Sequence, residues 1–145
     1  MLLLTKKTEH GPSWYNQATM TNTSKAEWIL RIAVAGEFIG HGVFALQQKQ
    51  GWIKYFEAVG MSPEQALFWM PIIGVADIAL ALIVLARPIR VGLLWMALWG
   101  FWTALLRPLA GEPIWDFVER WANWGAPLAI LLLRSWPKNI KEWLS

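Results

Sequence analysis

The chain has 145 residues, of which 56% are hydrophobic and 16% charged, and its formal net charge is +3. This apolar content exceeds that of ordinary soluble domains, and the 12 Trp residues favour a protein at a lipid–water boundary. The absence of Cys excludes disulfides, thiolate metal sites and thiol redox chemistry. Because Lys and Arg do not cluster with exposed aromatic residues on one face, membrane topology explains the basic charge better than a nucleic-acid partner does.

The first 26 residues are polar and predict a cytoplasmic tail. The first membrane span is predicted at 28–46, where Glu37 and His41 stand one helical turn apart on one face. Such a carboxylate–imidazole pair can relay protons, although a buried structural hydrogen bond explains the same spacing. Gly36 and Gly40 in this span permit the close approach of another helix.

The second span is predicted at 65–86, after a polar loop that ends with Ser62 as a helix N-cap and Pro63 in the first turn. Asp77 is the one charged residue of this span and lies near its middle. An acid inside a bilayer is costly, so we expect Asp77 to be paired or functional.

The third span, predicted at 91–106, is uncharged and contains Trp99, Trp102 and Thr103 in its outer half. Thr103 and Arg107, which follows the span, share one helical stripe. The Trp side chains indicate contact with lipid or with the core, or else a surface on which a ligand ring can stack.

The fourth span is predicted at 117–133. Read as one continuous helix, its polar start places Asp116, Glu119, Arg120 and Asn123 on a single stripe. Asp116 and Arg120, four residues apart, form either a simple structural ion pair or part of a ligand-binding site.

These spans form one predicted membrane domain, 27–134, followed by a basic tail, 135–145. The predicted fold class is therefore all-α: a polytopic bundle of four transmembrane helices in the plasma (inner) membrane. With the N-terminus inside, nine of the 13 Lys and Arg residues fall on the inner side, which predicts that both termini are cytoplasmic. The four on the outer side are Lys49, Lys54, Arg107 and Arg120.

In this topology the polar groups converge on one outward-facing cavity. Glu37, His41 and Asp77 are the candidate proton-relay residues, because each is titratable and lies within a span. The candidate ligand-binding residues are Trp99, Trp102, Thr103, Arg107, Asp116, Glu119, Arg120 and Asn123. Because the acids of this region outnumber its cations, some are protonated, reach water or bind a cation. Two ligands on one face without a third do not make a metal site, so none is predicted.

Three features resemble the DoxX-like membrane proteins, a family that includes the DoxD-type small subunit of thiosulfate:quinone oxidoreductase. They are the first span LRIAVAGEFIGHGVFAL, the turn YFEAVGMSPE and the acid Asp77. The resemblance covers about residues 28–134 and implies a four-helix membrane bundle. For the oxidoreductase branch it implies the passing of electrons from a sulfur substrate to a membrane quinone. It implies no catalytic role for residues 107–124.

The leading hypothesis is a quinone-interacting redox subunit in the lipid bilayer, which receives electrons from a soluble or membrane partner. Its cofactor is unknown, and a quinone is the ligand that this hypothesis favours. One alternative is a non-enzymatic membrane scaffold or assembly subunit, and another is a small cation-binding carrier. Whether the chain is an enzyme stays open, and a homo-oligomer through Gly36 and Gly40 is compatible with all three hypotheses.

Overall fold

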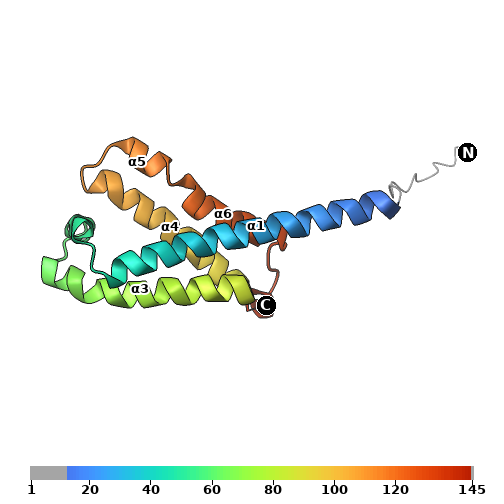
Figure 1. The fold of residues 1–145 in the computed structure, drawn as a ribbon, viewed down its shortest axis with the longest axis horizontal. Coiled ribbons are helices and arrows are strands. Elements are labelled where there is room, and N and C mark those ends of the chain that lie inside the picture. The colour runs from blue at the N-terminus through green and yellow to red at the C-terminus, as the bar shows by residue number, and fades with distance from the viewer. Residues whose placement is uncertain (1–12, 145) are drawn as a thin grey trace, which may run out of the picture.

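The computed structural model describes residues 13–144, and every element in that part of the chain is a helix (Figure 1). The elements are α1 (Ser13–Leu46), the 3-10 helix η1 (Gln50–Trp52), α2 (Ile53–Glu57), α3 (Pro63–Ala86), α4 (Arg90–Leu109), α5 (Ile114–Val118), α6 (Trp121–Leu133) and α7 (Ile140–Trp143). For these residues the predicted all-α class is confirmed.

The four long helices form two pairs. α1 lies along α3, and α4 lies along α6 (Figure 1). The pairs meet through contacts of α1 with α6 and of α3 with α4, and they diverge towards the end where α2 and α5 lie (Figure 1). Where the pairs meet, all four helices contribute to one apolar core, made of Val34, Ala35, Phe38, Ala81, Val84, Leu93, Met96, Ile130 and Leu131. The diverging end encloses a cavity instead.

α3 begins where the sequence predicts, with Ser62 as its N-cap and Pro63 as its first residue. The Ser62 hydroxyl accepts a hydrogen bond from the Gln65 backbone amide at 3.3 Å, and the Gln65 side chain accepts one from the Ser62 amide at 2.8 Å. This reciprocal pair satisfies backbone amides that a helix start otherwise leaves free. It thereby fixes the start of α3 and the position of Asp77, about four turns further along the helix.

Two segments are long and apolar enough to cross a membrane, Asn22–Leu46 in α1 and Pro63–Ala86 in α3. The predicted spans 28–46 and 65–86 fall inside them. The 24 residues of α3 measure about 36 Å, against about 30 Å of bilayer hydrocarbon. No other helix within the described residues meets the same length and hydropathy. α4, which contains the predicted span 91–106, has its mean hydropathy lowered by three indoles and two arginines.

The predicted fourth span, one helix over 117–133, is wrong in that form, because the chain makes two helices there. A turn at Glu119 and Arg120 separates α5 from α6. Arg120 leaves the helical conformation, and its guanidinium donates to the Asp116 carbonyl oxygen at 2.6 Å, in place of the missing backbone amide. With 13 residues, α6 is about 20 Å long and shorter than the hydrocarbon core.

The close approach of α1 and α3 takes place at Gly42 and Gly74, whereas the sequence singles out Gly36 and Gly40. A methyl group on Gly42 would lie 2.8 Å from the Gly74 carbonyl oxygen, and one on Gly74 would lie 2.7 Å from the Gly42 carbonyl oxygen. At Gly36 and Gly40 such a methyl group would have no neighbour within 4 Å apart from its own helix backbone. Gly36 and Gly40 therefore lie on an open face of α1.

At the end opposite the cavity, arginine side chains tie helix ends together. Arg31, 8% exposed, donates from Nε to the Val84 carbonyl oxygen at 2.8 Å and from Nη2 to the Leu85 carbonyl oxygen. These are carbonyls that the C-terminus of α3 leaves without helical partners. Arg134, which follows α6, donates to the Glu27 carboxylate of α1 at 2.8 Å. The sequence predicts only that Arg31 is a charge on the inner side of the membrane. In the structure Arg31 also caps the C-terminus of α3.

Both predicted tails contain helix. Of the predicted N-terminal tail 1–26, residues 13–26 belong to α1 and extend it beyond the bundle (Figure 1). The first twelve residues of that tail lie outside the described part of the chain. The predicted basic tail 135–145 contains α7, which Arg90 holds to the bundle by donating to the Glu142 carbonyl oxygen at 3.1 Å.

Candidate functional site

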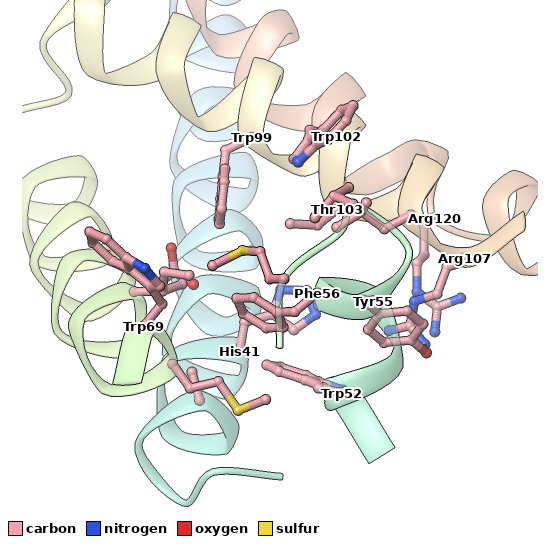
Figure 2. Close-up of a pocket in the computed structure, with 17 residues that line it drawn as sticks. His41, Trp52, Tyr55, Phe56, Trp69, Trp99, Trp102, Thr103, Arg107 and Arg120 are labelled. Carbon is pink, nitrogen blue, oxygen red and sulfur yellow. The ribbon is translucent and has the colours of Figure 1, made fainter. Parts of the chain in front are cut away.

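A cavity of about 330 Å³ lies between the two helix pairs at their diverging end (Figure 2). Its walls come from the last part of α1, the first two thirds of α3, the part of α4 from Trp99 onwards and the segment η1–α2. Pockets for small ligands range from about 300 to 1,000 Å³. The cavity is therefore large enough for one ring-sized molecule and its nearest substituents.

Seven residues that the sequence singles out line this cavity. They are His41 of α1, Asp77 of α3, Trp99, Trp102, Thr103 and Arg107 of α4, and Arg120 of the turn before α6. The folding of the two helix pairs against each other brings together side chains up to 79 residues apart in the sequence.

Glu37 and Glu119 lie outside the lining. Glu37 is one turn from His41, but its Oε1 lies 3.8 Å from His41 Nδ1, which is beyond hydrogen-bonding distance. This buried oxygen has no hydrogen-bond partner among the described residues. Glu119 has a side chain that is 62% exposed and forms an ion pair with Arg120.

Asp116 and Asn123 do not line the cavity either. The predicted ion pair between Asp116 and Arg120 is wrong, because Arg120 contacts the backbone carbonyl of Asp116 and the carboxylate of Glu119. Asn123 lies where α6 packs on α4, and a methyl group on Gly100 would be 2.7 Å from its carbonyl oxygen. The turn at 119–120 places these residues on different faces, because the predicted polar stripe requires one continuous helix.

Aromatic side chains outside the predicted site residues form much of the remaining wall. Trp52, Tyr55 and Phe56 come from η1 and α2, and Trp69 comes from α3 (Figure 2). Three aromatic residues within five positions of an otherwise polar loop are the signal that could have identified this segment. Such residues bury a large apolar area, so a loop that carries them packs against something.

The titratable residues of the cavity are held against aromatic rings. Trp99 stacks on Trp95, with ring centroids 6.1 Å apart and 8° between the planes, and its indole N–H is a donor that interacts with the Asp77 carboxyl group. Asp77 is 5% exposed, so this donor compensates part of the cost of burying its carboxyl group. His41 contacts Trp52 edge to face, with centroids 5.8 Å apart.

A polar cluster closes the cavity on the side of α2. We call it the latch, and its members are Lys54, Tyr55, Arg107 and Glu112. The Tyr55 hydroxyl donates to Glu112 Oε1 at 2.6 Å, and Lys54 Nζ lies 2.7 Å from the same oxygen. Arg107 donates to the Tyr55 hydroxyl and to Glu112 Oε2, the latter at 3.4 Å. The latch therefore fastens α2 to the end of α4 and to the loop before α5.

The protonation states of Glu112 and Tyr55 are fixed at neutral pH. Burial acts to raise the pKa of Glu112, but hydrogen bonds from Lys54 and Tyr55 and the charge of Arg107 lower it to about 2. Burial, together with the hydrogen bond to Glu112, raises the pKa of Tyr55 to about 12. Glu112 is thus ionised and Tyr55 protonated, which is the arrangement that the hydrogen bonds require.

The charges of the cavity are separated in space. Arg107 and Arg120 lie together beside Tyr55 (Figure 2), whereas Asp77 belongs to α3. Both guanidinium groups act electrostatically on His41. The cavity thus offers hydrogen-bond donors at one side, a carboxyl group at another, and aromatic ring faces between them. A flat, mostly apolar molecule with acceptor atoms at its edges matches this distribution.

Within residues 13–144, no group of three or more His, Cys, Asp or Glu side chains is placed to hold a metal ion. No protein-family model matches the chain, and neither a curated protein nor a solved structure matches it. The resemblance to DoxX-like proteins therefore stays a prediction, and the cavity itself is the main guide to function.

Proposed function

We propose that this protein is a four-span plasma-membrane protein with both termini in the cytoplasm, and that its cavity binds a quinone as part of a DoxX-like redox subunit. α1 and α3 supply two segments long enough to span a bilayer. In this proposal α4, about 30 Å long, and the consecutive helices α5 and α6 complete the bundle. The arginines at the helix ends opposite the cavity support the orientation, because cytoplasmic ends of membrane helices are rich in Arg and Lys.

The observation that carries the proposal is the combination of aromatic walls with polar groups at separate edges. A quinone is a flat ring with carbonyl oxygens at two edges. Trp52 and Trp99 offer ring faces, and Arg107 and Arg120 offer donors for one carbonyl oxygen. Asp77, on α3, is the acidic group available to the other oxygen.

The cavity also contains groups that can move protons. Reduction of a quinone to a quinol consumes two electrons and two protons, and in this proposal the electrons come from a partner protein. His41 and Asp77 line the cavity and would deliver the protons to the carbonyl oxygens. Glu37, 3.8 Å from His41, would return a proton to the imidazole after a small side-chain rotation.

Binding of a quinone to the purified protein in lipid nanodiscs tests the proposal. The probe is a naphthoquinone without a tail, measured by calorimetry and native mass spectrometry. We expect wild-type protein to bind it and Trp99→Ala to weaken binding about tenfold, since loss of ring contacts removes about 1.5 kcal/mol. Trp115→Ala is the matched control, because Trp115 is 72% exposed and lies outside the cavity. Failure of the wild type to bind, or equal weakening by both variants, contradicts the proposal.

Thermal unfolding of His41→Ala and Glu37→Gln separates this function from a scaffold. If either variant loses quinone binding while its unfolding temperature is unchanged, the side chain acts on the ligand. If both variants simply unfold, the polar groups serve to hold the helices together, and the scaffold hypothesis is favoured.

A further inference from the structure

The wall of the cavity that η1 and α2 form is closed. Trp52, Tyr55 and Phe56 form that wall, and Tyr55 is only 7% exposed. The latch holds the wall in place through Glu112 and Arg107, and the Arg107 guanidinium also lies 4.4 Å from the centre of the Tyr55 ring. Because these contacts involve ionised groups with several partners each, a ligand from water would have to break them to pass on this side.

The side between α3 and α4 has a different character. Trp69 of α3 and Trp102 of α4 both line the cavity and are 44% and 41% exposed, and Val59, in the loop that leads into α3, lines it and is 44% exposed. A lining residue with this much accessible surface lies where the cavity opens, so Trp69, Trp102 and Val59 mark the rim of an opening. The neighbouring outer surface is apolar, with Phe68 64% and Leu98 58% exposed. The opening therefore lies within an apolar part of the surface of the bundle.

We infer that the cavity takes its ligand from the hydrocarbon of the bilayer, through an opening between α3 and α4 rimmed by Trp69 and Trp102, and that the ligand carries an apolar tail. A cavity of about 330 Å³ accommodates a ring and leaves no room for a long chain, so the tail extends through the opening into lipid. This inference rests on the proposed quinone site and narrows its ligand to a ring with an apolar chain.

Thiol labelling tests the opening, because the chain contains no Cys and a single introduced thiol has no background. Trp69→Cys and Trp102→Cys place the thiol at the rim. Phe68→Cys is the control on the apolar outer surface of α3, and Glu57→Cys is the control on exposed α2. Each variant is reconstituted in nanodiscs with and without a bulky maleimide. For each variant, the rate of uptake of a prenylated quinone is compared between the labelled and the unlabelled protein. Because both samples carry the same substitution, the loss of the indole does not affect the comparison.

We expect the label at either rim position to slow uptake about tenfold or more, and the labels at Phe68→Cys and Glu57→Cys to change it less than about twofold. Slow uptake with the label at Glu57→Cys and normal uptake with both rim labels would show that the ligand comes from water. That result overturns the inference, as does unchanged uptake in all four variants.

A second readout needs no quinone and keeps the two proposals distinguishable. Thr103→Cys places a thiol on the cavity wall. We expect an apolar maleimide dissolved in the bilayer to react with it, and a charged, membrane-impermeant thiosulfonate to react much more slowly than with Glu57→Cys. Equal reaction of the charged reagent at both positions refutes access from lipid. If access from lipid holds but wild-type protein binds no quinone, the proposed function alone is wrong.

Discussion

Replacement of Gly42 by Ala tests the packing of α1 against α3. The added methyl carbon would lie 2.8 Å from the Gly74 carbonyl oxygen, against an ordinary contact of at least 3.4 Å. Because this oxygen belongs to a helix backbone, the two helices have to move apart by about 0.6 Å. Overpacking of this kind costs about 1–3 kcal/mol, and the higher helix propensity of Ala returns up to about 1 kcal/mol. We therefore expect a net destabilisation of about 1–2 kcal/mol.

Thermal unfolding in mild detergent, followed by circular dichroism, measures this effect. Gly36→Ala is the matched control, since it makes the same change on the same helix where no neighbour lies within 4 Å. We expect the control to be as stable as wild type, or more stable by up to about 1 kcal/mol, owing to helix propensity alone. If Gly42→Ala unfolds at the wild-type temperature, or if Gly36→Ala is equally destabilised, the proposed contact between the backbones is refuted.

Two further predictions concern charged residues. Because the pKa of Glu112 is lowered from 4.5 to about 2, its contribution to stability is complete above pH 4.5 and is lost as the pH falls towards 2. We expect unfolding temperatures of wild type and Glu112→Gln to differ at pH 7 and to converge across that range; a constant difference would contradict the assigned role. Arg31→Met leaves the Val84 and Leu85 carbonyls without their donor and should cost about 2–3 kcal/mol in chemical unfolding. Arg87→Met, at an exposed position, should change stability by less than about 0.5 kcal/mol, and equal losses would contradict the capping role.

Local patterns were sufficient to locate the helices that begin and end on sequence signals. Ser62 and Pro63 mark the start of α3 because capping involves only residues within one turn. The apolar runs 28–46 and 65–86 predict two long helices for the same reason, since the length of an apolar run is a property of neighbouring residues. The polar residues of the spans, such as His41 and Asp77, were found because such groups are rare in apolar segments.

The tertiary structure decided which of these faces meet. Gly40 and Gly42 are two residues apart and therefore point about 160° away from each other around α1, and only the packing of α3 shows that Gly42 is the contact. Glu112 and Tyr55 are 57 residues apart, and their hydrogen bond depends on where α2 and the loop before α5 lie after the long helices have packed. The sequence by itself thus determined the two long apolar helices and the chemical groups they carry. The relative rotation of the helices, which arises from contacts between distant residues, decided that these groups enclose a cavity.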